Sequence, residues 1–378
     1  MSSDQRLESE QLTALIEAGD VTALSFEQLA QSVREEPGLA DFRPDGVFQI
    51  DPRNGERIVF NAARARRPHD NRPDEKAPPE PPERACVVCQ GKTTGILDVA
   101  PLSEGVTFIN KNLYPVLYPD LQETPPSPAA TAPGPAAGLH LLQWTSSHHD
   151  RDWHNMPQAD RVVVMQRLAA LEKTLLEQGA EGLPPSPHNP TAAPVFVSII
   201  KNYGHLVGGS LIHGHQQIAL SNLIPRRLLD NWRFAQAHGE TFAAYMLREN
   251  PASLRVDDYG PATLLVPYFM RRPYDMLLVL KDVRKRYLHE LDADEITAVA
   301  EGWHDAIRAI RAVMPSIGRE IAYNIVTHNG PGAGLYFEFL PYTQEIGGLE
   351  HLGLYICQGT PEEVARRLRD LLNKPSAG

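Results

Sequence analysis

The sequence has 378 residues, of which 42% are hydrophobic, so it is long enough for two domains or for one large domain with a substantial core. Its formal net charge is −11 and it has no block of lysine and arginine, which argues against a nucleic-acid groove or an anionic membrane surface as partner. No apolar run predicts a membrane span, no signal peptide is visible after Met1, and three cysteines do not make a disulfide framework. We therefore expect a cytoplasmic protein.

The first part of the chain is predicted to be helical and then to form a hairpin. Residues 1–40 read as two short helices, and the run from Ser25 to Gln28 has the pattern of a capping box. Strand-like runs at 47–50 and 57–60 surround a turn that contains Pro, Asn and Gly, which predicts a β-hairpin.

The rest of the chain alternates predicted strands and helices. Stretches rich in Pro and Ala at 71–84 and 119–138 predict exposed loops. The predicted strands are 107–110, 139–145, 195–200, 264–268, 275–280, 321–327 and 336–340. The predicted helices are 158–178, 226–250, 293–313 and 361–373. The order strand, loop, helix, strand occurs twice, at 139–220 and at 275–340, which indicates two copies of one α+β unit.

A histidine pair carries the most specific chemical signal. His213, His215 and Gln217 are spaced by two, so they project from one face if this segment is extended. One imidazole can attack phosphorus while the carboxamide holds a phosphoryl oxygen. A pair of structural histidines in a Gly-rich turn is the alternative. Small and polar residues upstream let backbone N–H groups approach an anion closely, namely Asn202, Gly204, Gly208, Gly209 and Ser210.

Two cysteines form a second pattern, Cys86-Val87-Val88-Cys89. Such a pair indicates metal or redox chemistry, and the lack of a thioredoxin-like context favours metal. Two further ligands are needed for a tetrahedral site. Several histidines lie between 140 and 154, so the spacing alone does not settle which of them would bind.

The motifs together resemble a known family. The run Lys201-Asn202-Tyr203-Gly204 through His213-Gly214-His215-Gln216-Gln217 resembles the active-site segment of galactose-1-phosphate uridylyltransferases of the histidine-triad superfamily, which also includes nucleotide-sugar and dinucleoside phosphorylases. The resemblance covers roughly residues 42–375. It implies an α+β fold of two tandem histidine-triad-like units, each a mainly antiparallel sheet with packed helices. The implied division is a helical N-terminal extension at 1–40, an N-terminal half at 41–225 with the metal site and nucleophile, and a C-terminal half at 226–378.

The resemblance also implies roles for individual residues. His215 would be the nucleophile that forms a covalent nucleotidyl-histidine, and Gln217 and Ser210 would hold the phosphoryl oxygens. Nucleotide or phosphate contacts are implied for Arg64, Arg67, Asn112, Asn202, Gly208, Gly209 and Gln217. The implied zinc ligands are Cys86, Cys89, His148 and His213, with His149 as the alternative to His148.

The C-terminal half departs from the pattern of some members of the family. Some uridylyltransferases bind a second metal there through a Glu and three His. Here Tyr336 stands where a His would be and His328 matches one ligand position, so we predict no second metal. Contacts to the acceptor are implied for Tyr336, Glu338, Gln344 and Gly347.

The resulting prediction is a ping-pong nucleotidyltransferase that resembles hexose-1-phosphate uridylyltransferases. Its partners would be a nucleotide sugar and a sugar 1-phosphate or phosphate, and it would be a homodimer. A phosphorylase that transfers the nucleotide to inorganic phosphate is the main alternative, since both kinds of enzyme share the His-x-His-x-Gln pattern. A non-catalytic nucleotide-binding or zinc-stabilised scaffold is a further one. Gln217 in place of a third histidine weighs against a hydrolase.

Overall fold

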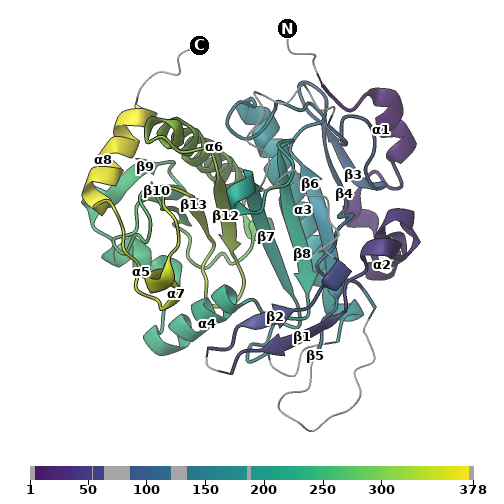
Figure 1. The fold of residues 1–378 in the computed structure, drawn as a ribbon, viewed down its shortest axis with the longest axis horizontal. Coiled ribbons are helices and arrows are strands. Elements are labelled where there is room, and N and C mark those ends of the chain that lie inside the picture. Colours follow the sequence, from purple (N-terminus) through teal and green to yellow (C-terminus); the bar gives the residue numbers. More distant parts are fainter. Residues whose placement is uncertain (1–4, 53, 64–85, 121–133, 185–188, 374–378) are drawn as a thin grey trace. The chain divides into compact units, whose positions relative to one another are not determined.

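The computed structural model describes residues 5–52, 54–63, 86–120, 134–184 and 189–373 (Figure 1). Its contacts divide the chain into two compact units. Unit 1 comprises residues 1–152, 167–199 and 213–229, and unit 2 comprises 153–166, 200–212 and 230–378. Both units combine antiparallel strands with helices, which confirms the predicted α+β class. The predicted division at residues 40 and 225 stays a prediction.

The sheet of unit 1 carries the His-x-His strand. Its strands lie in the order β3, β4, β6, β8, and each pair is antiparallel. Their bounds are β3 (Ile96–Pro101), β4 (Val106–Lys111), β6 (Gly138–Trp144) and β8 (His215–Ser221). Helix α3 (Gln158–Gly182) packs on this sheet with its C-terminal part, where a Cβ added to Gly179 would lie 2.7 Å from Cδ2 of Leu220. The glycine thus allows the helix to approach the strand that bears the nucleophile motif.

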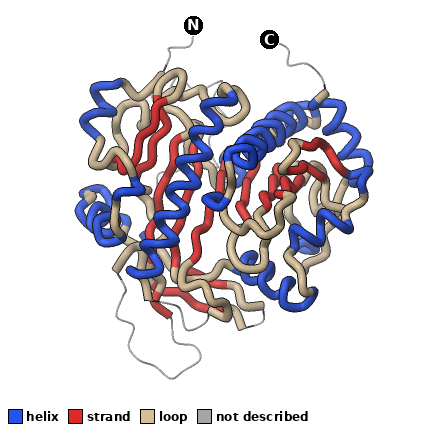
Figure 2. Tube along the Cα trace, turned by 180° about the vertical axis from the view of Figure 1, so that it is seen from behind, coloured by secondary structure: helices blue, strands red, loops and turns tan. Residues whose placement is uncertain are grey.

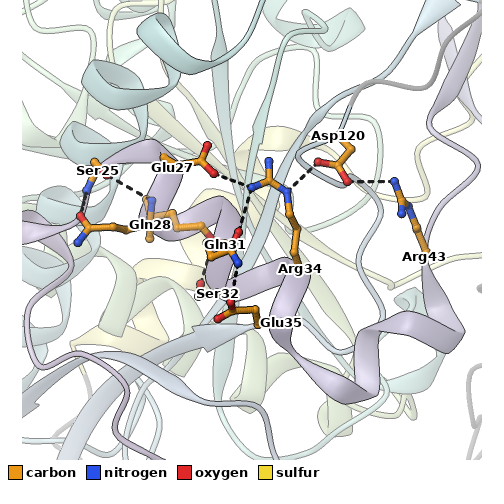
Figure 3. Close-up of polar contacts among 10 residues, drawn as sticks. Ser25, Glu27, Gln28, Gln31, Ser32, Arg34, Glu35, Arg43 and Asp120 are labelled. Carbon is orange, nitrogen blue, oxygen red and sulfur yellow. Dashed lines mark hydrogen bonds and ion pairs between the residues drawn. The ribbon is translucent and has the colours of Figure 1, made fainter.

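The N-terminal residues of unit 1 form the helices that the sequence predicts, α1 (Ser9–Leu15) and α2 (Phe26–Glu35). The capping box is confirmed, because the side chain of Ser25 accepts from the backbone N–H of Gln28 and the side chain of Gln28 accepts from that of Ser25. Arg34 of α2 donates to Asp120 at 2.8 Å, and Arg43 donates to the other oxygen of the same carboxylate at 3.1 Å (Figure 3). Two 3₁₀ turns complete this region, Val21–Ala23 and Pro37–Phe42.

The predicted hairpin is also present in unit 1. Strand β1 (Val47–Ile50) pairs with β2 (Arg57–Val59), and Gly55 takes a left-handed conformation (φ 80°) in the turn. A short strand, β5 (Gly134–Pro135), pairs with the other edge of β1. This strand lies inside 119–138, which the sequence predicts to be a loop. Most of that stretch, and all of the predicted loop at 71–84, lie outside the described residues.

Unit 2 contains a second antiparallel sheet segment. Its strands follow the order β7, β12, β13, β11, β10, β9. Their bounds are β7 (Phe196–Tyr203, in unit 2 from Ile200), β12 (Tyr323–His328), β13 (Tyr336–Pro341), β11 (Met276–Leu280), β10 (Ala262–Leu265) and β9 (Arg255–Asp258). Helix α6 (Ala293–Ser316) packs on β10, β11 and β13, and long helices lie over strands in both units in Figure 2. The side chain of Trp303 fills this contact, edge-on to Phe337 and Phe339.

Several predicted boundaries in unit 2 are wrong. The single helix expected at 226–250 is two helices, α4 (Arg226–His238) and α5 (Phe242–Glu249). Gly239 takes a left-handed conformation (φ 72°) that ends α4, and Thr241 caps α5 through the N–H of Ala244. The sequence did not predict β3 or β9. Helix α7 (Gly348–His351) and the final helix α8 (Pro361–Leu372) complete the unit. None of the helices in the described part of the chain is long and apolar enough to cross a membrane.

Candidate active site and metal centre

His215 is the first residue of β8, and its imidazole is held from two sides. Its Nδ1 lies 2.8 Å from the backbone carbonyl oxygen of His213, and its ring packs at 4.9 Å against that of Trp144 on the neighbouring strand. The side chain is buried, with 6% of its surface exposed. A carbonyl can only accept, so Nδ1 carries the proton and Nε2 carries the lone pair. Nε2 is therefore the nitrogen of this imidazole that could act as a nucleophile.

Strand β8 begins at His215, so His213 lies outside the extended segment that the spacing predicts. Gln217 follows His215 by two residues on β8, so these two side chains share a face of the strand, as predicted. His213 lies before the strand, and its Nε2 donates to the carbonyl oxygen of Ser146 at 2.7 Å. Its Nδ1 faces Sγ of Cys86 at 3.7 Å and Sγ of Cys89 at 3.5 Å. The two histidines therefore make different contacts, although only Gly214 separates them in the sequence.

Four side chains of unit 1 form a group that could hold a metal ion: Cys86, Cys89, His149 and His213. Their donor atoms lie within 4.8 Å of one another. A tetrahedral zinc site with bonds of about 2.3 Å to sulfur and about 2.0 Å to nitrogen places these donors about 3.5 Å apart. The sulfur–nitrogen distances of 3.5, 3.7 and 3.8 Å match that geometry. The residues present therefore fit a closed zinc site.

The fourth member of this group differs from the predicted ligand. His149 belongs to the group, whereas the ring of His148 lies beside Gly105, where an added Cβ would be 2.8 Å from Cδ2 of the imidazole. The backbone N–H of His149 donates to the carbonyl of Gln5 at 2.9 Å, a contact that fixes this register. This grouping favours His149, which the sequence analysis gave as the alternative to His148.

The contacts in this group shift the proton affinities of its members. The pKa of the Cys86 thiol is well below its usual range, chiefly because of the hydrogen bond with Cys89, with help from His149 and His213. The pKa of the Cys89 thiol is raised, because it retains the proton that it shares with Cys86 and because it is partly buried. Hydrogen bonding to Cys86 raises the pKa of His149. A bound cation would replace the shared protons and stabilise both thiolates.

A chain of buried polar groups supports the turn between the two histidines, and no sequence pattern signals it. The backbone N–H of Thr145 donates to the carbonyl of Gly214 at 2.9 Å, and its hydroxyl lies 3.1 Å from Oδ1 of Asp152 and 3.3 Å from Oε1 of Gln216. Gly214 itself lies against Asp152, where an added Cβ would be 2.6 Å from Cγ of the carboxylate. Only a residue without a side chain therefore fits between His213 and His215.

The Gly-rich segment before the motif belongs to unit 2. Gly204 and Gly208 both have left-handed backbone angles (φ 90° and 84°), and the N–H of Gly209 donates to the carbonyl of Gly204 at 3.0 Å. Asn202 accepts a hydrogen bond from Asn324 at 2.7 Å, which ties the end of β7 to β12. Ser210 is half-buried just after this turn.

The remaining predicted nucleotide contacts are one turn residue and two arginines. Asn112 forms the turn after β4, since its side-chain oxygen accepts from the N–H of Tyr114 at 2.9 Å while its amide nitrogen contacts the ring of His140. Arg64 and Arg67 lie outside the described residues.

In unit 2, the residues at the position of the second metal site of some uridylyltransferases contact one another through hydrogen bonds and ring stacking. Nε2 of His328 lies 2.8 Å from Glu338, and Nδ1 of the same ring lies 3.1 Å from the amide nitrogen of Asn231. The hydroxyl of Tyr336 donates to the amide oxygen of Asn231 at 2.9 Å, and its ring stacks on His328 at 4.2 Å. Asn231 was not recognised in the sequence, because nothing in its neighbourhood on α4 signals a partner about a hundred residues away.

The two other predicted acceptor residues hold a loop. The side chain of Gln344 donates to the carbonyl of Ile356 at 2.8 Å and accepts from the N–H of Gln358 at 3.2 Å. The N–H of Gly347 donates to Glu350 at 2.9 Å at the start of α7. Gln344 thus fixes the segment that follows Gly347.

Comparison with known proteins finds similarity to the kind of proteins that the motifs indicated. No family model matches the sequence. The ADP-glucose phosphorylase of Arabidopsis thaliana is 22% identical over 345 residues, which cover 85% of this chain and 92% of that protein. A solved uridylyltransferase superposes with a TM-score of 0.67 at 21% identity, covering 86% of this chain and 98% of that one.

A second solved structure is that of an ADP-glucose phosphorylase from Arabidopsis thaliana with bound ADP-glucose. It has a TM-score of 0.60 and 18% identity, and covers 85% of this chain and 98% of that one. The fold is therefore that of the uridylyltransferase-like proteins. The similarity to galactose-1-phosphate uridylyltransferases and their nucleotide-sugar phosphorylases is confirmed.

Proposed function

We propose that this protein is a nucleotidyltransferase that acts on nucleotide sugars through a covalent nucleotidyl-His215. The observation that carries the proposal is the hydrogen bond between Nδ1 of His215 and the carbonyl of His213, at 2.8 Å. It fixes the tautomer in which Nε2 can attack, and the carbonyl dipole stabilises the positive charge that the ring gains when Nε2 bonds to phosphorus.

The reaction would take place in two steps. In the first, Nε2 of His215 attacks the α-phosphorus, the bond to the bridging oxygen breaks, and a sugar 1-phosphate leaves. In the second, an oxygen of the acceptor phosphate attacks the same phosphorus, the nitrogen–phosphorus bond breaks, and His215 is regenerated. Gln217 and Ser210 would hold the phosphoryl oxygens, while Arg64 and Arg67 would offset phosphate charge. Asn112, Asn202, Gly208 and Gly209 would contact the nucleotide.

We propose inorganic phosphate as the first of two candidate acceptors for the second step. A sequence relative that covers 85% of the chain is an ADP-glucose phosphorylase, which supports this branch. The products would then be a nucleoside diphosphate and a sugar 1-phosphate. A hexose 1-phosphate as acceptor, with Tyr336, Glu338, Gln344 and Gly347 as its contacts, is the second candidate, supported by the match to the uridylyltransferase fold.

We further propose that zinc occupies the group of Cys86, Cys89, His149 and His213. All four positions of a tetrahedral ion would be filled by protein, so the ion would act as a structural cross-link. The whole enzyme would consist of two histidine-triad-like units with a helical N-terminal extension, and would act as a cytoplasmic homodimer.

The test is mass spectrometry of the intact protein after incubation with ADP-glucose or UDP-glucose. The wild type should gain the mass of one nucleotide, and the size of the gain identifies the nucleotide. His215→Ala should gain nothing, whereas His148→Ala, a change outside the proposed machinery, should behave as wild type. Normal turnover by His215→Ala would refute the covalent mechanism. Release of the nucleotide by phosphate but not by any hexose 1-phosphate would select the phosphorylase branch.

A further inference from the structure

Unit 2 contains a cavity of about 490 Å³ that none of the proposed catalytic or metal-binding residues lines. Volumes of 300–1,000 Å³ are typical of sites for small molecules. Three arginines line the cavity, Arg319 before β12 and Arg366 and Arg367 on α8. Three guanidinium groups around one cavity are notable in a chain whose formal net charge is −11.

The carboxylates nearby do not neutralise all of this charge. Glu345 pairs with Arg319 at 2.9 Å, and the one lining carboxylate, Glu363, accepts from the hydroxyl of Thr360 at 3.0 Å. Among the described residues no carboxylate pairs with Arg366, which is exposed. The lining therefore keeps a net positive charge.

Arg367 is oriented by neutral partners. It donates to the hydroxyl of Tyr274 at 2.8 Å and to the hydroxyl of Ser316 at 2.6 Å. Its guanidinium also lies 5.5 Å from the centre of the Tyr274 ring. These contacts hold the guanidinium in place without cancelling its charge, which is the arrangement that a binding site for an anion needs.

Tyr274, which also lines the cavity, has an unusual backbone conformation. Its backbone is left-handed (φ 71°), and no other non-glycine residue in the described part of the chain has a positive φ. This conformation is costly for an aromatic residue and concentrates at ligand-binding and switch positions. Here it places the ring that Arg367 contacts along the cavity.

We propose that this cavity binds a small phosphate-bearing anion, in addition to the nucleotide proposed at His215. Planar guanidinium groups bind phosphate through paired N–H donors, and two of the three here are not matched by an acid. Gln358 also lines the cavity, and its N–H donates to Gln344, which fixes the segment that contains Gly347. An anion bound here would therefore order residues 344–358.

The proposal can be tested by hydrogen–deuterium exchange of the full-length protein with and without inorganic pyrophosphate at constant ionic strength. Exchange is read peptide by peptide, so binding at this cavity is separated from binding near His215. We expect protection of peptides within 344–373. In Arg366→Ala, the pyrophosphate concentration that gives half of this protection should rise by about tenfold, because the change removes charged hydrogen-bond donors.

The matched control is Arg233→Ala, which removes an exposed arginine of α4 that does not line the cavity. It should leave the protection of 344–373 unchanged. Protection confined to peptides around 213–217, or equal protection in the wild type and Arg366→Ala, would overturn the proposal. Neither result depends on whether His215 forms an adduct.

Discussion

At the scale of single residues, His213 links the cysteine–histidine group to His215, the proposed nucleophile. Its Nδ1 faces the two thiols, its Nε2 donates to Ser146, and its carbonyl accepts from His215. The hydrogen bond from Nε2 to Ser146 orients the imidazole and fixes Nδ1 as the nitrogen that would face a metal. An ion bound at Nδ1 would immobilise the whole residue, including the carbonyl that sets the tautomer of His215. The metal would thereby position the nucleophile without touching the substrate.

Adjacent histidines allow a sharp test of the metal ligands. His149→Ala removes a member of the group and should lower the zinc content of the purified protein from about one per chain to well below half. His148→Ala should keep its zinc, because that ring lies beside Gly105 instead. Elemental analysis of both variants, purified alike, measures this. Zinc loss in His148→Ala alone would restore the assignment made from the sequence.

Asp275 makes stability depend on pH. Its side chain is 5% exposed, and burial raises its pKa to about 7, aided by Glu338 and opposed by Arg272. A carboxyl whose pKa is higher in the folded state destabilises that state once it must ionise. The cost is absent below the unfolded pKa of 3.8, grows with pH, and is complete above about 7, where it reaches at most about 4 kcal/mol.

We therefore expect Asp275→Asn to flatten the pH dependence of stability. The melting temperature of the wild type should fall more between pH 4.5 and pH 8 than that of the variant, by several degrees. Asp370→Asn, an exposed change on α8, is the control and should follow the wild type. Equal slopes for Asp275→Asn and the wild type would show that Asp275 does not ionise at a raised pKa.

At the scale of elements, the N-terminal segment is fastened to β4 through a buried lysine. Lys111 is 1% exposed, and its Nζ lies 2.6 Å from Glu17 and 2.9 Å from Glu36. Asp120 adds the contacts to Arg34 and Arg43 that Figure 3 shows. A buried ammonium is costly unless it is paired, so the residues that follow helices α1 and α2 supply the charges that let β4 keep this lysine.

The double change Glu17→Gln and Glu36→Gln should destabilise the protein by about 2–3 kcal/mol, because it leaves Lys111 buried without a counter-charge. Adding Lys111→Met should recover most of the loss, since a methionine fills the site without charge. Urea unfolding of the double and triple variants measures both effects. Glu177→Gln, which breaks an exposed pair with Lys173, should cost almost nothing. No recovery in the triple variant would mean that the carboxylates act through other contacts.

At the scale of the whole molecule, the sequence predicted what depends on local pattern. The pattern of apolar residues predicts α6 and β11, and the capping box predicts the start of α2. The edge strand β9 was missed because Arg255-Val256-Asp257-Asp258 is mostly charged and shows no apolar alternation. The choice between His148 and His149 rests on a backbone contact with Gln5, and the partner of His328 is Asn231 on α4. Neither contact has a local signal, because each joins residues far apart in the chain.

The division into two units gives a last prediction. All four residues of the metal group belong to unit 1, so a chelator should loosen unit 1 first. Removing a structural ion that contributes several kcal/mol should lower the melting of that unit by on the order of 10 °C. Hydrogen exchange should then rise in peptides that cover 86–91, 145–149 and 213–221, while β11 and β13 of unit 2 stay protected. The double variant Cys86→Ser and Cys89→Ser, already without metal, should not respond to the chelator. If β11 and β13 loosened together with the metal group, the two units would unfold as one, and the ion would stabilise the entire chain.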